Sequence, residues 1–482
     1  MRLVIEYVQQ FRRFQRNARL FLISNVLSGV TAGILLVLYN LYLVSLGYHA
    51  DFVGVILFIG TIGAGLAIFP AGACVDRFSG KYILICSSAL IGIAGLGQIL
   101  FRQPLPLLVS AFVAGIGLAF LLVIAAPFLT LNSTPEERSH LFSMNISLSL
   151  ITLVLGEFIG GALPAWFRSF PWLMAPLSPS LLATQPDPRS YQLALLFAGI
   201  IAAPSFIPLF MMSNVRPPSS TTNRTVNETP VYSRGAPLRS PSRWRSPSGW
   251  RSPSWWGSAF RMRLFFSRIL SLINTLGHSA FFYLMLVYAL TGLGAGLFIP
   301  YFNIYFVQHL NASPAFFGLI DGGANAITAL LTLTAPHLAK RIGKINTITL
   351  TRLASIPLLL TIGLTSILPL AALLYLFRQG TMDMSLGILQ VFSMESVTEK
   401  HRGLANSSYQ TAFQVPWAIA APIGGLIIVH FGYSPIFLLG AFFYILTIII
   451  LWAKFGRGKR SGYDDISLHS DETFSSECKE IS

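Results

Sequence analysis

The sequence predicts an all-α membrane protein in which twelve transmembrane helices form two parallel six-helix bundles. Three observations lead to this fold class. Only 11% of the 482 residues are charged, whereas a soluble globular chain carries about 25%. Apolar runs of about 20 residues, the length that crosses a bilayer, recur from Leu20 to Trp452. One long polar stretch, residues 214–278, divides these runs into six and six.

Each apolar run is expected to be a helix, because a backbone in lipid must satisfy its hydrogen bonds within the segment. The predicted ends of each helix are accurate to about four residues. The expected spans are residues 21–46, 52–74, 82–101, 105–131, 141–166, 191–213, 280–308, 315–338, 345–367, 369–393, 404–430 and 434–453.

The basic side chains predict how the chain crosses the membrane. Of the 33 Lys and Arg residues, all but five lie in the two terminal segments and in the loops on the same side; the exceptions are Arg102, Arg168, Arg189, Arg352 and Arg378. Cytoplasmic loops of membrane proteins are rich in Lys and Arg. We therefore expect a multi-pass protein of the cell (plasma) membrane with both termini in the cytoplasm. Because the net charge of +15 lies in these loops, we expect no nucleic-acid partner.

An internal repeat relates the two groups of six spans. Asn40 and Asn303 lie in similar aromatic segments at an offset of 263 residues. Since six spans keep the direction of the chain, the halves are expected to be related by an axis along the membrane normal, with the substrate cleft between them. The expected domains are residues 1–213 and 279–456, a cytoplasmic loop at 214–278 and a cytoplasmic tail at 457–482. Four pairs share an offset of 264 residues: Gly54 with Gly318, Arg77 with Arg341, Gly160 with Gly424, and Gly161 with Gly425.

The central loop contains a tandem Arg-Ser-Pro-Ser-x-Trp repeat that starts at Arg239, Arg245 and Arg251. Such low-complexity sequence cannot form a packed core. It is either a linker or a basic, Trp-bearing segment that lies on anionic lipids of the inner leaflet.

The loop after the second span resembles a signature of the major facilitator superfamily, a family of twelve-helix secondary transporters. It reads Gly72-Ala-Cys-Val-Asp76-Arg77-Phe-Ser-Gly-Lys81, and Gly72, Asp76, Arg77 and Lys81 match the signature. The equivalent loop in the second half keeps Arg341 and Gly343 but has Lys340 in place of the acid. The resemblance implies alternating access of a central site to the two sides of the membrane. It also implies that these loops are gating loops, formed by Gly72, Asp76, Arg77, Lys81, Arg341 and Gly343.

Nothing in the sequence points to an enzyme or to a cofactor. The chain lacks the Gly-x-x-x-x-Gly-Lys-Ser/Thr loop that holds nucleotide phosphates. Its eight histidines are scattered without the spacing of a metal site. We therefore expect no catalytic residue, no metal and no cofactor.

Acidic residues inside the spans are candidates for proton coupling, because each charge at mid-membrane costs at least about 2.5 kcal/mol on insertion scales. They are Glu157, Asp321 and Asp383. Glu157 lies in Gly156-Glu157-x-x-Gly160-Gly161, which is similar to the fifth-span signature of proton-driven antiporters with Glu in place of Pro. Alternatively, Glu157 makes a polar contact with a neighbouring helix, and Asp321 is solvated or lies near a helix start.

The candidates for the substrate cleft are Asn40, Asn303 and Arg378. The two asparagines either bind substrate or form hydrogen bonds between helices, which are worth about 0.6 kcal/mol in bilayers. Arg378 and Asp383 are about 140° apart on a helix and do not face each other. Arg378 is therefore expected to favour an anion or to pair with an acid on another helix. Its repeat equivalent is Ala114, which argues against proton–drug antiport.

These features favour a secondary active transporter that exports small amphipathic molecules, with proton coupling as an option. We expect a small-molecule substrate, a surrounding bilayer and a monomer. One alternative is a symporter for uptake of a small organic solute or anion. Another is a membrane sensor or scaffold that does not transport and signals through the central loop.

Overall fold

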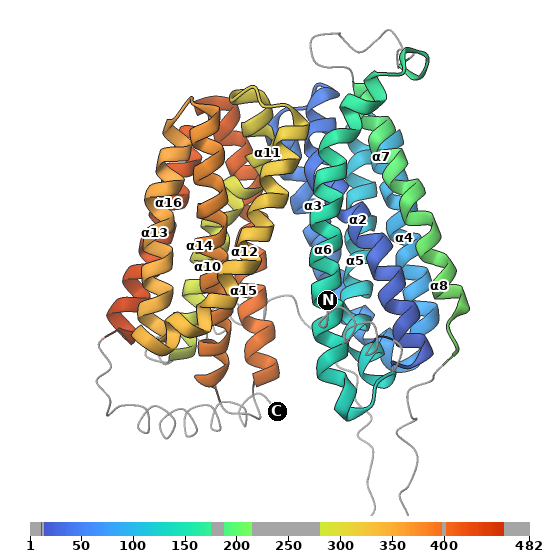
Figure 1. Cartoon of the computed structure of the whole chain (residues 1–482), viewed down its shortest axis with the longest axis horizontal. Helices are drawn as coiled ribbons and strands as arrows, with labels where there is room; N and C mark the ends of the chain where they lie inside the picture. Colours follow the sequence, from blue (N-terminus) through green and yellow to red (C-terminus); the bar gives the residue numbers. More distant parts are fainter. Residues whose placement is uncertain (1–10, 12–13, 175–187, 215–279, 398–401, 457–482) are drawn as a thin grey trace, which may run out of the picture. The chain divides into compact units, whose positions relative to one another are not determined.

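The computed structural model describes residues 11, 14–174, 188–214, 280–397 and 402–456, and all the described helices belong to one compact unit. The repeats of the central loop and the C-terminal tail lie outside the described residues. Figure 1 shows the helices as two bundles, one from the N-terminal half (blue to green) and one from the C-terminal half (yellow to red).

The N-terminal bundle contains six spanning segments. The sixth combines α7 and α8, which are separated by a short 3-10 turn at Ala203–Ser205. The segments are α2 (Arg16–Ser45), α3 (Ala50–Arg77), α4 (Gly80–Leu100), α5 (Pro104–Leu131), α6 (Pro135–Arg168), and α7 (Pro188–Ala202) with α8 (Phe206–Met211).

The C-terminal bundle also contains six spanning segments, and the first of them is irregular. Helix α10 (Ala280–Phe298) continues through a 3-10 turn (Ile299–Tyr301), α11 (Phe302–Ile304) and a π-helical turn (Tyr305–His309). The other segments are α12 (Pro314–Ile342), α13 (Lys344–Leu364), α14 (Leu368–Glu395), α15 (Arg402–Phe431) and α16 (Ser434–Phe455).

The predicted all-α fold of twelve spans is confirmed. Within the described residues, eleven segments are apolar and long enough to cross a membrane. The twelfth, α14, is 28 residues long, but polar side chains such as Arg378 and Asp383 lower its mean hydropathy. Helix α6 begins six residues before the predicted start, because Pro135 occupies its first turn, where a proline needs no backbone hydrogen bond.

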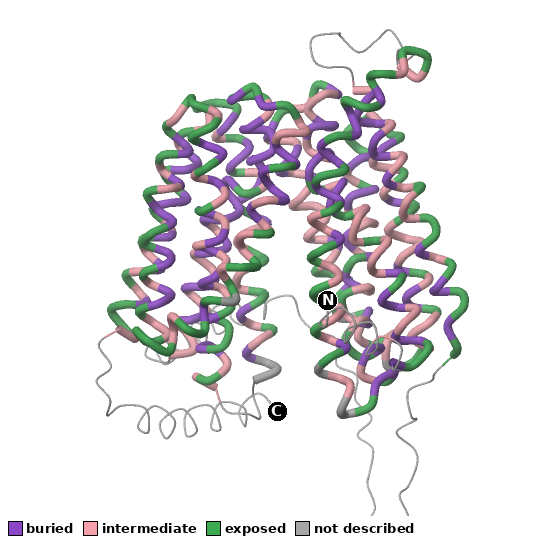
Figure 2. The backbone as a smooth tube through the Cα atoms, viewed as in Figure 1, coloured by how far each residue is buried: buried purple, intermediate pink, exposed green. Residues whose placement is uncertain are grey.

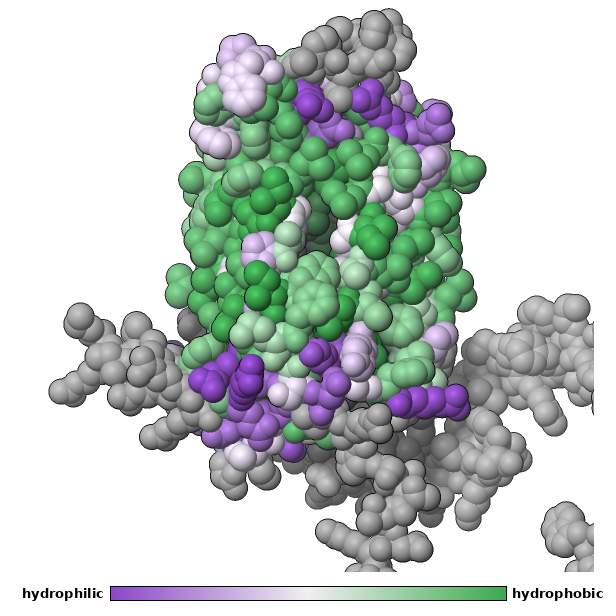
Figure 3. All heavy atoms as spheres, turned by 90° about the vertical axis from the view of Figure 1, so that its right-hand side faces the viewer, coloured by the Kyte–Doolittle hydropathy of each residue, from purple (hydrophilic) through white to green (hydrophobic). Residues whose placement is uncertain are grey.

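The outer surface is that of a membrane protein. Figure 3 shows a band of hydrophobic side chains between hydrophilic ones at the two ends of the helices. Large apolar side chains such as Leu105 and Ile200 are about 70% exposed to the surroundings. An apolar surface of this extent is unusual for a soluble monomer and is stable in contact with lipid. The chain is therefore a multi-pass membrane protein.

The two halves meet at one end of the helices. We call it the contact end; α2 ends there at Ser45 and α3 begins at Ala50. The opposite end, where Lys81 and Lys344 lie, is called the basic end. Two helix pairs make most of the contact between the halves, α3 with α15 and α6 with α12, and α2 also contacts α11 and α12. Buried positions meet between the bundles at the contact end, and half-buried and exposed positions face each other toward the basic end (Figure 2).

Candidate functional site

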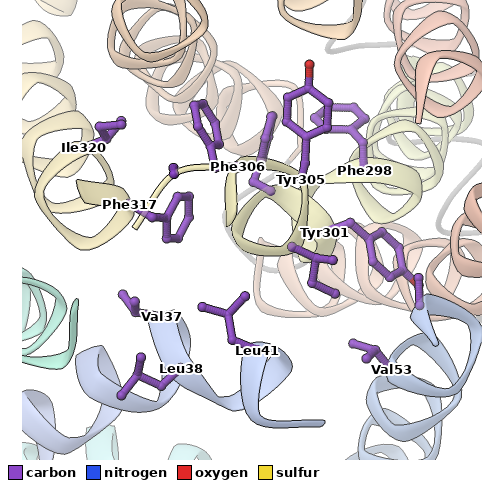
Figure 4. Close-up of a cluster of buried hydrophobic side chains, with 14 of the residues drawn as sticks. Val37, Leu38, Leu41, Val53, Phe298, Tyr301, Tyr305, Phe306, Phe317 and Ile320 are labelled. Atoms are coloured by element: carbon purple, nitrogen blue, oxygen red, sulfur yellow. The ribbon is translucent and has the colours of Figure 1, made fainter. Parts of the chain in front are cut away.

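A hydrophobic cluster closes the contact end between the halves. Val37, Leu38 and Leu41 of α2 face residues of the irregular segment that follows α10, including Tyr301 and Phe306 (Figure 4). All five side chains are at most 3% exposed. The cluster excludes water between the halves, so no open path crosses the protein at this end.

Asn40 and Asn303 reinforce this closure by hydrogen bonds between the halves. Asn40 Nδ2 donates to the Pro300 carbonyl at 2.8 Å, and Asn303 Nδ2 donates to the Val37 carbonyl at 3.3 Å. Pro300 interrupts regular helix, because proline lacks an N–H and clashes with the preceding turn. The structure thus places both cleft candidates in the contact between the halves, with their amides bonded to main-chain carbonyls.

Glycines allow the helices of the two halves to approach closely. A Cβ atom at Gly161 of α6 would lie 2.7 Å from the Pro314 carbonyl oxygen of α12. A Cβ atom at Gly425, the repeat equivalent, would lie 2.6 Å from Cα of Asp51 in α3. Real Cβ atoms do not approach backbone atoms this closely, so the closed contact requires glycine at both positions.

Glu157 lies in the contact between α6 and α12 and is fully buried. Asn325 of α12 donates from Nδ2 to both carboxylate oxygens of Glu157, at 2.9 Å to Oε1 and 3.0 Å to Oε2. The acid of the N-terminal half is therefore held by an amide of the C-terminal half. This contact depends on the relative position of the two bundles.

Asp321 lies one turn before Asn325 on α12 and is 7% exposed. Its Oδ1 atom accepts a hydrogen bond of 2.8 Å from the Tyr375 hydroxyl of α14. The side chain is thus buried two turns inside the helix, and the solvated position that the sequence left open does not apply. Asp321 and Glu157 interact electrostatically. No Lys or Arg among the described residues forms an ion pair with either acid.

This polar cluster exists in only one of the two equivalent contacts. At the offset of 264 residues, Glu157 corresponds to Ala421 and Asp321 corresponds to Leu57. In the contact between α3 and α15, Tyr301 donates its hydroxyl to the Ala421 carbonyl. The two contacts therefore share a similar close approach of helices. The contact between α6 and α12 contains two buried carboxyl groups, whereas Asp51 in the contact between α3 and α15 is half-buried.

Arg378 of α14 is buried among aromatic rings inside the C-terminal bundle, with 1% of its surface exposed. Its guanidinium carbon lies 4.8 Å from the ring centre of Phe298, 5.8 Å from Phe302 and 6.0 Å from Tyr444. Nη2 also donates to the Tyr444 hydroxyl at 3.3 Å. The rings stabilise the cation through their negative faces.

Asp383 does not form an ion pair with Arg378. Gln379 lies between them, because it accepts a hydrogen bond from Arg378 Nη1 at 3.1 Å and donates to Asp383 Oδ2 at 2.9 Å. The carboxylate is half-buried. Arg378 and Asp383 thus belong to one polar chain but point to different sides of α14.

Arg352 of α13 is a buried charge that the sequence analysis did not select. It is fully buried, and Nε donates to Ser385 of α14 at 3.2 Å. Nη1 donates to Thr291 of α10 and Thr447 of α16, both at 3.1 Å. One guanidinium thus joins four helices.

The sequence analysis also did not select Asn325, Tyr375 and Gln379. Asn325 and Gln379 could have been found, because each lies four residues from an acid on the same helix.

The first of the two loops that the resemblance predicts to be gating loops lies at the basic end. Lys81 donates from Nζ to the Phe210 carbonyl at 2.7 Å, which satisfies a carbonyl near the end of α8. Arg77 is exposed, and no atom lies within 4 Å of a Cβ placed at Gly72. The side chain of Asp76 lies outside the described part of the structure.

The second predicted gating loop joins α12 and α13, also at the basic end. Gly343 forms the turn with φ of +89°, a conformation that favours glycine. Arg341 is exposed. Within the described ranges, no group of three or more His, Cys, Asp or Glu side chains could hold a metal ion.

The fold defines a two-bundle membrane transporter, and comparison with known proteins assigns the family. The model of the Major Facilitator Superfamily matches residues 21–296 and 284–468. The chain therefore belongs to this superfamily of transporters. No curated protein sequence matches the chain.

Several solved structures share the fold. A bacterial homologue of the human lysosomal transporter Spinster, inward-facing and unoccupied, is 14% identical, with a TM-score of 0.60 over 91% of this chain and 94% of that one. An inward-facing bacterial homologue of the iron transporter ferroportin is 15% identical, with a TM-score of 0.63 over 91% and 98%. The inward-open xylose transporter XylE from E. coli is 13% identical, with a TM-score of 0.61 over 93% and 98%.

Proposed function

We propose that the protein is a secondary active transporter that works by alternating access and exports small amphipathic molecules in exchange for protons. The observation that carries this proposal is the pair of buried acids, Glu157 and Asp321, at the contact between the halves. Glu157 belongs to the N-terminal half, and Asp321 to the C-terminal half. A proton bound to this pair can therefore change the energy of the contact.

The basic end is proposed to face the cytoplasm, as the distribution of Lys and Arg favours. The described conformation would then be inward-facing, because the halves meet at the contact end. The inward-facing conformations of the three similar structures support this interpretation. In the outward-facing state, the gating loops with Arg77 and Arg341 would approach each other and close the basic end.

Charge repulsion provides the coupling. Asp321 lies one turn from Asn325, which holds Glu157, and the two carboxyl groups interact electrostatically. Two negative charges about 6 Å apart would repel by about 3 kcal/mol at an effective dielectric constant of 20. One proton removes the repulsion and stabilises the closed contact end. Loss of the proton destabilises the contact and favours the outward-facing state.

This sequence of events suits export. In the outward-facing state the acid pair takes a proton from outside, and the contact end closes. Release of the proton to the cytoplasm, when substrate binds, restores the repulsion and opens the contact end with the substrate inside. A proton is thus exchanged for a substrate, because the protein changes between the inward-facing and outward-facing states only when one of the two replaces the other.

The experiment is a measurement of proton flux in proteoliposomes with an imposed pH gradient. Cationic, neutral and anionic amphipathic compounds are added in turn, and dissipation of the gradient is recorded. Wild-type protein should show compound-dependent flux, and both Glu157→Gln and Asp321→Asn should abolish it. Glu395→Gln is a matched control, because it makes the same change in an exposed acid that pairs with Lys344. Unchanged flux in both cluster variants would reject the proposed coupling site.

A further inference from the structure

Helix α12 has a line of polar side chains that runs from the buried acids toward the basic end. Residues separated by four, three and four positions lie on one face of a helix. On α12 these residues are Asp321, Asn325, Thr328 and Thr332. Exposure increases along them: Asp321 is 7% exposed, the next two residues are half-buried, and Thr332 is exposed. We call these four residues the polar line of α12.

The polar line points away from the lipid. Leu330 of α12 is exposed and apolar, as expected for a side chain in contact with lipid. It follows Asp321 by nine residues, a rotation of about 900°, so the two side chains lie on opposite sides of the helix. The sides between them are covered, by α6 at Gly322 and by α14 at Leu331. Thr332 is therefore exposed toward the space between the halves, where half-buried and exposed positions face each other (Figure 2).

The facing helix α6 and the repeat-equivalent helix α3 are largely apolar at the matching positions. On α6, the face that carries Glu157 continues toward the basic end with Leu150 and Ile146, both exposed. On α3, Thr61 is the only polar residue at the four positions that correspond to the polar line, and its hydroxyl donates to the Leu57 carbonyl. The polar line therefore occurs in α12, next to the acids, and not in its repeat equivalent. The four positions of α3 are Leu57, Thr61, Ala64 and Ile68.

Thr328 has an unpaired hydroxyl in the middle of the polar line. Its Oγ1 atom is buried, and no hydrogen-bond partner for it occurs among the described residues. Thr332, in contrast, donates to the Thr328 carbonyl at 2.8 Å. A buried hydroxyl without a protein partner is commonly satisfied by water. Neighbours on the line are about 5–6 Å apart, which one water molecule spans with a hydrogen bond of about 2.8 Å on each side.

We propose that the polar line is the path by which protons pass between the acid pair and the basic end, with Thr328 holding the water molecule that links Asn325 to Thr332. This inference rests on the proposed transport function and adds its proton route. A proton released from Glu157 or Asp321 binds to a water oxygen. Each oxygen along the line, of water or of a hydroxyl, then accepts one hydrogen and passes on another, so no atom is gained or lost. Thr328 is a positioning residue, because it acts on the water and not on the acids.

The first test measures water access and requires no transport. The variants Thr328→Cys, Thr332→Cys and Leu330→Cys are made after the native cysteines are replaced. Each purified full-length protein in detergent then reacts with a charged methanethiosulfonate reagent, which stays in water. We expect fast reaction of Thr332→Cys, slower reaction of Thr328→Cys, and no reaction of Leu330→Cys, the control on the lipid side. No reaction of either threonine variant would overturn the proposal.

The second test removes the hydroxyl but keeps the shape of the side chain. Thr328→Val should slow compound-dependent proton flux in proteoliposomes several-fold and leave exchange of labelled for unlabelled compound unchanged. Thr328→Ser should restore the flux. Because Oγ1 of Thr328 has no described protein partner, the valine variant should fold like wild type. Thr334→Val is the matched control, since it makes the same change on another side of α12, where the hydroxyl bonds to the Leu331 carbonyl.

The proton path and the proposed function can fail separately. Absence of compound-dependent flux in the wild-type protein would reject the proposed function, whereas the cysteine reactions would still decide whether water reaches the polar line. Normal wild-type flux that Thr328→Val leaves unchanged would overturn the path and leave the proton coupling intact.

Discussion

Asn40 and Asn303 each donate a hydrogen bond to the main-chain carbonyl that lies three residues before the other asparagine, at Pro300 and Val37 respectively. The two bonds are thus equivalent under the repeat that relates the halves. Both cross from one half to the other at the contact end. They form only when this end is closed, so they stabilise one of the two states of the transporter.

Asn40→Ala and Asn303→Ala should each shift the protein toward the state with an open contact end. A hydrogen bond between membrane helices contributes about 0.6 kcal/mol, so each variant should change the ratio of the two states about threefold. Because the bonds are equivalent, the double variant should show about the product of the two effects. Spin labels at the exposed residues His49 and Gln308, one in each half, can report the distance across the contact end after the native cysteines are replaced.

The control for these variants is Asn346→Ala, which removes an amide at the basic end whose hydrogen bond, to the Ile342 carbonyl at the end of α12, stays within the C-terminal half. Its distance distribution should match that of wild type. If the double variant Asn40→Ala/Asn303→Ala has the same distance distribution as wild type, the two bonds do not stabilise the closed state.

Gly425→Ala should also favour an open contact end, for a steric reason. The added methyl group would collide with the backbone of Ala50 and Asp51, so α15 must move away from α3. Helix packing in membranes depends on such small residues. Reaction of a cysteine at the buried position Leu41 with a polar thiol reagent should become faster. Gly387→Ala, where no atom lies within 4 Å of the new Cβ, should leave the rate unchanged.

Arg352→Lys should destabilise the C-terminal bundle. Lysine is a point charge and cannot reproduce the fork that reaches Ser385, Thr291 and Thr447. Disruption of a buried charge network costs several kcal/mol, so the melting temperature should fall by about 5 °C or more. Thermal unfolding in detergent measures this change. Arg341→Lys, at an exposed position, is the comparison. An equal fall in its melting temperature would contradict a specific role for Arg352.

The helices could be predicted because their signal is local. Each span must be long and apolar, so hydropathy alone locates it. The residues of α6 before position 141 are mostly polar, and hydropathy therefore does not detect them. The family followed from the loop with Gly72, Arg77 and Lys81, whose spacing is also local. Arg378 and Asp383 were recognisable because a charge in a span is rare.

The partners of these charges could not be predicted, because they come from other helices. Asn325 and Tyr375 are uncharged and common in spans, and their roles depend on how α12 packs against α6 and α14. The repeat paired Asn40 with Asn303, but their acceptors are main-chain carbonyls, which sequence patterns do not reveal. The aromatic surroundings of Arg378 arise from α10 and the adjacent α11 and from α16, which lies far from both in the sequence.

The central claim is that protons drive transport through Glu157. The most direct measurement compares two activities in the same proteoliposomes: exchange of labelled for unlabelled substrate without a gradient, and accumulation of substrate driven by a pH gradient. The substrate is a compound that gives proton flux with the wild-type protein in the panel described above. Glu157→Gln should retain exchange and lose gradient-driven accumulation, whereas Glu395→Gln should retain both. Accumulation by Glu157→Gln at the wild-type level would contradict the account.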